Sequence, residues 1–217
     1  MNIERFITSM AVNNTYLAYC PGSKKGIVID PSYEIDDVLK RIDELKLDIK
    51  FIFNTHGHCD HIAGNAAVKY ATRAEIVIHE LDAPALTNPE LNLSAMVPPH
   101  VLSPIAGKIV KDNEKIVIET NLGPLEFEVW HAPGHSPGHC CLKFHRGIFT
   151  GDILFEGTIG RTDFPGCNAI DMKNSLIRLW NNIPENFEIF PGHNETTNMA
   201  KEKRDNYYFS HMVVSNL

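Results

Sequence analysis

The chain has 217 residues, of which 43% are hydrophobic and 22% are charged, a balance typical of folded globular proteins. A chain of this length can bury a core of ordinary size, so we expect residues 1–217 to form one domain. The formal net charge is −7. An acidic surface repels phosphate backbones, so we expect no nucleic-acid partner.

The N-terminal segment and the cysteines together indicate a cytoplasmic protein. Met1–Phe6 lacks the basic and then apolar run of a signal peptide. No stretch approaches the roughly 18 apolar residues that a membrane span requires, so we expect no membrane partner. The five cysteines form no CxxC pair. This pattern favours reduced thiols over a disulfide framework and over a structural zinc site.

The first half of the chain alternates short β-rich runs with a helical pattern. In Glu34–Leu45 the apolar residues recur at helical spacing, which predicts an amphipathic helix. Asp48–Asn54 contains an apolar run, which predicts a largely buried strand. The other predicted elements are strands at Ile3–Met10, Thr15–Tyr19, Gly26–Ile29 and Glu75–His79, and a helix at about Ile62–Thr72.

The second half repeats this arrangement loosely. Strands grouped in each half and followed by helices fit two sheets packed together with helices outside. The predicted elements are strands at Lys115–Glu119, Leu125–Trp130, Cys140–Phe144, Ile148–Thr150 and Phe187–Phe190, and a helix near Met172–Trp180.

The segment Thr55–His61 carries the strongest functional signal. It places three histidines and one aspartate within six positions, at the end of a buried strand. In an extended chain, residues two apart point the same way, so His56 and His58 can bind one ion together. If the chain then turns into a helix, Asp60 and His61 face the same space from another angle. We therefore interpret HxHxDH as a metal-binding motif rather than a polar loop that happens to be rich in histidine.

Three further segments place ligand-type side chains at the ends of predicted strands. His131, His135 and His139 lie in a loop fixed by glycine and proline. Asp152 and His193 each follow directly on an apolar strand. Each of these alone is more typical of a cap or a turn. Together with the first motif they supply seven ligands from four strand ends, enough for two ions that share a carboxylate.

These motifs, in this order and over nearly the whole chain, resemble the metallo-β-lactamase superfamily. The matching pieces are HxHxDH, a histidine within an APGHSPG loop, TGD and PGH. The segment Ile159–Gly166 further resembles the glyoxalase II-like (hydroxyacylglutathione hydrolase-like) branch in its short bacterial form. The persulfide dioxygenases carry a similar segment.

The resemblance implies an α+β fold, a four-layer αββα sandwich, with the metals in a groove at one edge of the two sheets. It implies two divalent metal ions per chain, with zinc as the expected metal and iron or manganese as alternatives. The implied ligands are His56, His58 and His135 for the first ion, Asp60, His61 and His193 for the second, and Asp152 as the bridge. We interpret the other histidines as structural or as supporting the ligands: His79, His100, His131, His139, His145 and His211.

The implied function is hydrolysis of a small hydroxyacylglutathione-like thioester, or of an ester, by a metal-bridging hydroxide. Two cations lower the pKa of a shared water from about 15.7 toward about 7. Asp60 is expected to orient this nucleophile. A thiolate leaves with little protonation, because a free thiol has a pKa near about 8.5, which favours a thioester over an amide. The alternative is a persulfide dioxygenase of the same fold with a single non-haem iron.

Three other classes of protein fit the sequence less well. A secreted β-lactamase should carry a signal peptide. A nuclease of this fold should carry basic or inserted segments that bind RNA. A non-catalytic binding module would not need all seven ligand positions filled.

Several residues are left with two interpretations. Arg161 either binds a substrate carboxylate or pairs with Asp163 to fix its loop. We interpret Cys59 as a spacer and Cys167 as a small core residue, with a reactive thiol at Cys167 as the alternative. The apolar segment Leu91–Pro104 is either a flap over the groove or a loop packed on the sandwich.

Overall fold

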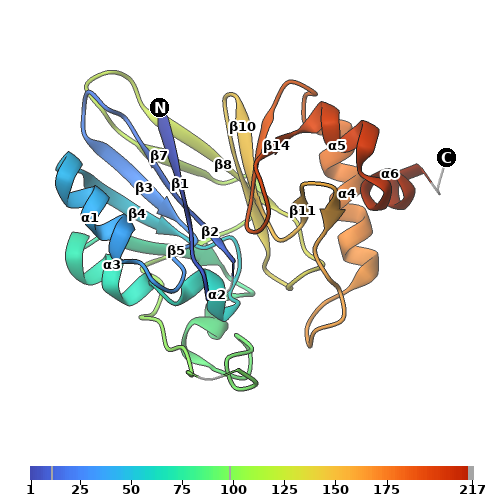
Figure 1. Cartoon of the computed structure of the whole chain (residues 1–217), viewed down its shortest axis with the longest axis horizontal. Coiled ribbons are helices and arrows are strands. Elements are labelled where there is room, and N and C mark those ends of the chain that lie inside the picture. Colours follow the sequence, from blue (N-terminus) through green and yellow to red (C-terminus); the bar gives the residue numbers. More distant parts are fainter. Residues whose placement is uncertain (11, 98, 215–217) are drawn as a thin grey trace.

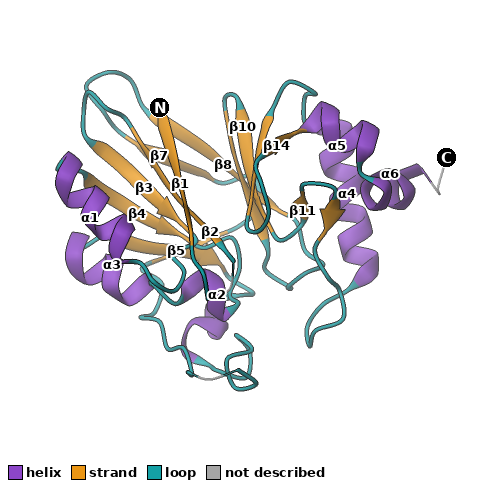
Figure 2. Ribbon diagram, in the orientation of Figure 1, coloured by secondary structure: helices purple, strands orange, loops and turns teal. Residues whose placement is uncertain are grey.

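Two six-stranded sheets pack face to face, and helices cover the outer side of each sheet (Figure 1). The computed structural model describes residues 1–10, 12–97 and 99–214. The order of layers is helix, sheet, sheet, helix (Figure 2), which is the α+β sandwich predicted from the sequence. Within the described residues, no helix combines the length and apolar character needed to cross a bilayer.

The first sheet is formed by the N-terminal half of the chain. Its strands, in spatial order, are β1 (Asn2–Ile7), β2 (Asn14–Tyr19), β3 (Lys25–Ile29), β4 (Asp48–Phe53), β5 (Glu75–His79) and β6 (Lys108–Val110). The strands from β3 to β6 run parallel. The carboxyl ends of parallel strands meet at one edge of a sheet, so the loops after β3, β4 and β5 lie together there.

Four helical segments belong to this half: α1 (Asp36–Leu45), α2 (Cys59–Ile62), α3 (Asn65–Thr72) and the 3₁₀ helix η1 (Ala83–Thr87). Helices α1 and α3 cover the outer face of the first sheet (Figure 1). Val38 and Ile42 of α1 and Val68 of α3 are buried there in one apolar cluster with Ile52 and Ile76 of the sheet. This packing fixes β4, whose end carries the HxHxDH motif.

The second sheet is formed by the C-terminal half. Its strands, in spatial order, are β14 (Thr197–Asn198), β13 (Glu188–Pro191), β10 (Gly147–Gly151), β9 (Cys140–Phe144), β8 (Leu125–His131) and β7 (Lys115–Ile118). Strands β10 and β13 run parallel, so Asp152 and His193 follow two strand ends at the same edge. The remaining elements are the hairpin β11 (Leu154–Phe155) and β12 (Thr158–Ile159), and the helices α4 (Ala169–Asn182), α5 (Met199–Asp205) and α6 (Tyr207–Val214).

The core between the two sheets is rich in aromatic side chains. Tyr16, Phe53, Phe127 and Phe149 are buried there, and the Tyr16 and Phe149 rings lie 5.3 Å apart between centroids. Large rings bury much apolar area and prefer such edge-to-face contacts. They join the two sheets, so that the edges carrying the ligand-type residues are held in register.

Two predicted elements differ from the structure at their ends. The first strand stops at Ile7 and not at Met10, because the chain turns there and Thr8 N donates to Asn13 O over 3.0 Å. The predicted helix Ile62–Thr72 is two helices, α2 and α3, separated at Gly64. The helical hydrogen bonds are interrupted there because Gly64 N donates to Pro31 O over 2.8 Å, and the close approach leaves no room for a Cβ, which would lie 2.6 Å from Ser32 O.

The elements that the sequence did not predict are short or lie near the C-terminal end. Strands β6, β11, β12 and β14 have two or three residues, too few for an alternating pattern to appear. Helix α5 did carry a signal, because the Asn198 side chain caps it by accepting from Lys201 N over 2.9 Å.

Candidate metal centre

The site forms where a loop from the first sheet meets a loop from the second sheet. Residues 54–61 follow β4, and residues 132–139 join β8 to β9. Cys140 N donates to Thr55 O over 2.7 Å, which ties the two loops at their base. The HxHxDH motif therefore faces the APGHSPG loop across the sandwich.

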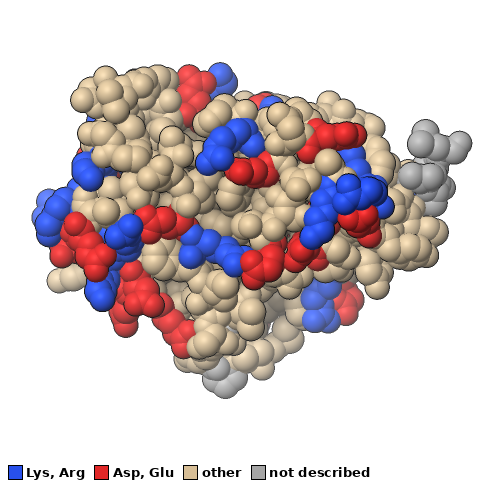
Figure 3. Space-filling view, turned by 45° about the horizontal axis from the view of Figure 1, so that its top comes forward, with Lys and Arg blue, Asp and Glu red and all other residues tan. Residues whose placement is uncertain are grey.

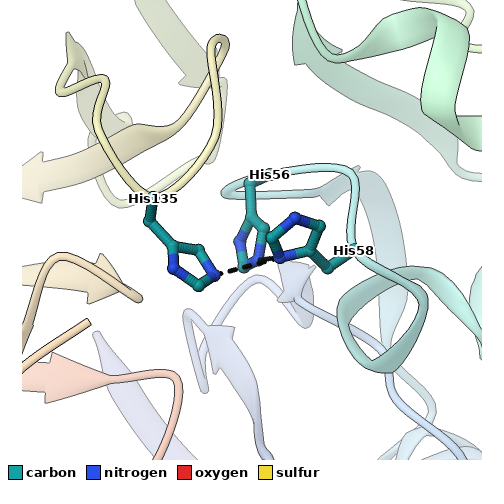
Figure 4. Close-up of side chains that lie close together, drawn as sticks. All are labelled: His56, His58 and His135. Carbon is teal, nitrogen blue, oxygen red and sulfur yellow. Dashed lines mark hydrogen bonds between the residues drawn. The ribbon is translucent and has the colours of Figure 1, made fainter. Parts of the chain in front are cut away.

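Three buried histidines form the first group of the site. His56 Nε2 and His135 Nε2 each lie 3.0 Å from His58 Nδ1 (Figure 4). Their other ring nitrogens have partners: Thr55 Oγ1 lies 3.1 Å from His56 Nδ1, and His135 Nδ1 donates to Arg161 O over 2.9 Å. Partners of this kind fix the orientation of a ring and leave the inward nitrogen free for a cation.

Asp60, His61 and His193 form the second group, in which one ligand atom from each residue lies within 4.8 Å of the others. His193 Nε2 lies 3.3 Å from Asp60 Oδ2, and His61 Nε2 lies 3.6 Å from the same atom. His193 Nδ1 donates to Val12 O over 3.0 Å, in a loop that packs beside the site.

Asp152 lies between the two groups. Its Oδ2 is 3.3 Å from His135 Nε2 and 3.4 Å from His193 Nε2, and its Oδ1 is 3.4 Å from His61 Nε2. The Oδ1 atom is buried and has no hydrogen-bond partner among the described residues. A buried carboxylate oxygen without a hydrogen bond is costly, and a bound metal ion would satisfy it. The imidazole and carboxylate donors are those that divalent metals such as zinc take in proteins, so the residues fit a metal centre.

The structure thus brings together all seven residues that the sequence marked as ligands. It leaves the other histidines outside these groups. His139 is buried beside the cluster, where its Nε2 accepts from Asp152 N over 2.9 Å. His131 stacks on His79 with ring centroids 4.1 Å apart.

The second group holds opposite charges close together. Burial alone would lower the pKa of His61, but the carboxylates of Asp60, Asp152 and Asp30 outweigh it and raise that pKa to about 9. Burial likewise opposes protonation of His193, whose pKa Asp152 and Asp60 raise to about 11. Both imidazoles are therefore protonated at neutral pH when no metal is bound, and a cation must displace these protons.

The first group behaves in the opposite way. Burial and the neighbouring His135 ring lower the pKa of His58 to about 3. Burial and the rings of His61 and His58 lower the pKa of His56 well below its usual value. These rings are neutral imidazoles at pH 7, which is the form that binds a metal.

Sequence reasoning missed Asp30, which follows β3 at the same sheet edge. It is buried, with Oδ2 3.0 Å from His61 Nδ1 and 2.7 Å from Thr55 Oγ1. Its Oδ1 accepts from Thr55 N over 2.7 Å. This carboxylate orients the His61 ring. An acidic residue directly after an apolar strand was the available signal. Nearby, the buried Asn13 places its side-chain nitrogen 3.0 Å from His61 Nε2.

Asp82, just before η1, was also missed. Its buried carboxylate accepts from Gly57 N over 2.9 Å in one ligand loop. It also accepts from Ser136 Oγ and Gly138 N, each over 2.6 Å, in the other loop. Asp82 therefore fastens the two histidine-bearing loops to each other. Nothing local in the sequence marks it, because its partners lie 25, 54 and 56 residues away.

A cavity of about 520 Å³ opens above the centre. Its lining includes candidate ligands of both groups, together with Cys59, Arg161 and apolar side chains from two flanking segments. Arg161 makes a two-pronged ion pair with Asp163, at 2.6 and 2.8 Å, and is exposed. Cys59 belongs to neither ligand group. Cys167 lies beside the cluster, where its Sγ donates to His135 O over 2.8 Å and burial raises the pKa of its thiol.

The irregular segment 91–104 contributes to the rim of this cavity; Pro98 lies outside the described residues. Asn92 anchors the segment by donating to Ala85 O and Val101 O, each over 3.0 Å. Leu93 is buried against the cavity, whereas Met96 and Val97 line it and remain exposed. The segment therefore combines the two predicted interpretations. One end packs on η1, as a loop on the sandwich would, and the middle borders the groove, as a flap would.

The fold and the clustered ligands define the class of protein. The profile of the metallo-beta-lactamase superfamily matches residues 10–193, and the chain belongs to this superfamily. Hydroxyacylglutathione hydrolase GloC of Haemophilus influenzae is 31% identical over 221 residues, covering 97% of this chain and 99% of that protein. A probable metallo-hydrolase of Streptococcus pyogenes is 30% identical over 212 residues, covering 96% and 90%.

Solved structures share the whole architecture. The BLEG-1 B3 metallo-beta-lactamase has a TM-score of 0.88 at 26% identity, covering 96% of this chain and 100% of that one. TTHA1623 in a di-iron-bound form has a TM-score of 0.81 at 28% identity, covering 94% and 98%. ETHE1 from Myxococcus xanthus has a TM-score of 0.78 at 27% identity, covering 100% and 92%.

Proposed function

We propose that the chain is a metal-dependent hydrolase of a small thioester, with two divalent ions held by the seven clustered residues. The observation that carries this proposal is Asp152, whose carboxylate contacts histidines of both groups and keeps one buried oxygen without a hydrogen bond. A carboxylate that bridges two metal ions must lie between their two ligand groups, as Asp152 does. The proposed ligands are His56, His58 and His135 for one ion, Asp60, His61 and His193 for the other, and Asp152 for both.

The chain's own residues would position the reactants. When bound, the two ions would lower the pKa of a water molecule toward about 7 and polarise the substrate carbonyl. Asp60 lines the cavity and is partly exposed, so its carboxylate can accept a hydrogen bond from that water and aim it at the acyl carbon. Asp30 and Arg161 O hold the rings of His61 and His135, so the inward nitrogens stay in place during turnover.

The lining of the cavity favours a thiolate as the leaving group. Among its described residues, the titratable side chains other than the proposed ligands are Cys59 and Arg161. Burial raises the pKa of the Cys59 thiol, and a guanidinium does not give up its proton in proteins. An amine would need a proton to depart, whereas a thiolate needs little help because its conjugate acid has a pKa of about 8.5.

Two similar proteins support the proposal. GloC is described as a hydroxyacylglutathione hydrolase, which is a thioester hydrolase. TTHA1623 holds two irons, so iron stands beside manganese as an alternative to zinc, the metal we expect. A small-molecule substrate, a cytoplasmic location and a one-domain organisation complete the proposal.

The test is thioester hydrolysis by protein loaded separately with zinc, iron or manganese. Release of thiol from S-D-lactoylglutathione and from uncharged acyl thioesters should be measured side by side. Asp60→Asn should lower kcat by at least about 100-fold. Asp112→Asn is the control, because Asp112 bonds His131 N and Arg178 and no proposed ligand. Protein that holds two metals per chain and cleaves none of these thioesters would refute the proposal.

A second candidate is a dioxygenase that oxidises a persulfide at one non-haem iron. His56, His61 and Asp152 form a group whose ligand atoms lie within 4.8 Å of one another. Two histidines and one carboxylate are the ligand set of many such iron sites. One iron per chain, with oxygen uptake that depends on a persulfide, would favour this function over the hydrolase.

A further inference from the structure

The cavity above the centre has two apolar walls. Leu93, Met96 and Val97 come from the segment after η1, and Phe155, Ile159 and Phe164 come from the hairpin β11–β12 and the loop after it. These two segments flank the proposed ligands in one cavity of about 520 Å³. An aliphatic chain extending from the centre would lie against both.

Two of these side chains face solvent. Met96 is 58% exposed and Val97 is 62% exposed, although both lie in an anchored segment. Single exposed apolar residues need no explanation, but adjacent ones at the mouth of a site often mark a binding surface. An apolar ligand in the groove would cover them.

The same walls offer little to an anionic ligand. Arg161 is the only lysine or arginine among the described residues that line the cavity. Its guanidinium is already paired with Asp163 at 2.6 and 2.8 Å and lies 3.9 Å from the centre of the Phe164 ring. Glutathione carries two carboxylates, and the walls provide no unpaired cation for either.

We propose that the groove binds the apolar acyl chain of the substrate, so that the chain prefers aliphatic acyl thioesters to glutathione conjugates of small hydroxy acids. This rests on the proposed thioester hydrolysis. The metal centre would hold the thioester carbonyl, and Met96, Val97, Phe155 and Phe164 would contact the chain beyond it. Each methylene that leaves water then adds to transition-state binding.

The test uses S-acyl N-acetylcysteamine thioesters, which are uncharged and differ only in chain length. From acetyl to butyryl to hexanoyl, kcat/KM should rise about fourfold for each methylene. Hexanoyl thioester should also exceed S-D-lactoylglutathione. A flat series, or a preference for lactoylglutathione, would overturn the groove assignment and leave thioester hydrolysis standing. Failure to cleave any thioester would instead refute the proposed function.

Two variants distinguish residues that line the cavity from other exposed residues of the same segment. Met96→Ser should reduce the ratio of hexanoyl to acetyl kcat/KM by about fivefold, because it removes apolar contact and leaves a soluble surface residue. Leu102→Ser is the matched control, since Leu102 is exposed in the same segment and does not line the cavity. Equal effects of the two variants would contradict the proposal.

A third variant tests the alternative that Arg161 binds a carboxylate of the substrate. Arg161→Ala keeps the carbonyl that orients His135 and removes only the side chain. If the guanidinium serves only its ion pair with Asp163, any change in kcat/KM should be the same, within about threefold, for S-D-lactoylglutathione and for the hexanoyl thioester. A loss of more than about tenfold, with hexanoyl thioester unaffected, would show anion binding and overturn the proposal.

Discussion

At the scale of single residues, the ligand-type side chains were predictable and their supports were not. The HxHxDH motif can be recognised from a short stretch of sequence, because its spacing alone places several metal-binding side chains together. Asp82 and Asp30 act through partners that become neighbours only after the sheets form. The ion pair between Arg161 and Asp163 could not be predicted, because it depends on the conformation of their loop and no sequence pattern indicates that conformation.

The carboxylate of Asp82 gives a first prediction. Asp82→Asn replaces one acceptor oxygen by a donor, so the amide cannot accept from Gly57, Ser136 and Gly138 together. We expect metal affinity to fall about 10- to 100-fold, because the two histidine loops are no longer fastened. Titration with zinc against a competing chelator measures this. The control Asp112→Asn should retain wild-type affinity; an equal loss there would mean general destabilisation.

Protonation of the second group gives another prediction. Without metal, the pKa of His61 is about 9 and that of His193 is about 11, so both rings carry protons at pH 7. A metal binds only the neutral ring, so uptake should release protons, and apparent affinity should rise as pH increases below these pKa values. Zinc added to metal-free protein in weak buffer with an indicator dye measures the release. Uptake without net proton release would contradict the assignment of these two ligands.

At the scale of elements, long periodic segments were predicted and interruptions were not. The α1 pattern and the apolar β4 run both gave correct element types. The break at Gly64 depends on the carbonyl of Pro31, which accepts from Gly64 N over 2.8 Å and comes from another loop. The two-residue strands β11 and β12 form part of a cavity wall. Because the sequence did not predict these strands, it did not predict that wall of the groove.

The loop that carries His135 depends on one glycine. Gly134 has φ +140°, and a Cβ there would overlap the backbone of Met172 at the start of α4. Gly134→Ala should therefore lower the free energy of unfolding by about 2–4 kcal/mol. Gly123→Ala is the control, because Gly123 has φ +97° with open space around it and should cost about 1–2 kcal/mol. Urea denaturation measures both; equal losses would show that backbone strain alone is responsible.

At the scale of the whole molecule, the centre joins the two halves of the sandwich. His56, Asp60 and His61 come from the first half, and His135, Asp152 and His193 from the second. On the face seen in Figure 3, lysine and arginine are mixed with aspartate and glutamate, so no large field of one sign marks a polyanion-binding surface there. The family and the layers were predictable because the motifs span nearly the whole chain.

Because ligands from both halves meet, metal should stabilise the entire fold. At a free metal concentration 100 times the Kd, binding adds about 2.7 kcal/mol, which corresponds to a rise in Tm of about 5–10 °C for a chain of this size. Thermal unfolding of metal-free and zinc-loaded protein, followed by circular dichroism, measures this. An unchanged Tm in protein shown to hold metal would mean that the unfolded chain binds the metal as tightly as the folded one, which contradicts a site that only the folded chain assembles.

Metal content per chain, measured together for the wild-type protein and for Asp152→Ala, tests most directly whether these seven residues form one dinuclear centre. We expect about two ions per wild-type chain and no more than about one in the variant, with thioesterase activity lost and the circular dichroism spectrum retained. Two ions bound equally well by Asp152→Ala, or fewer than one in wild-type protein saturated with zinc, would contradict the dinuclear centre.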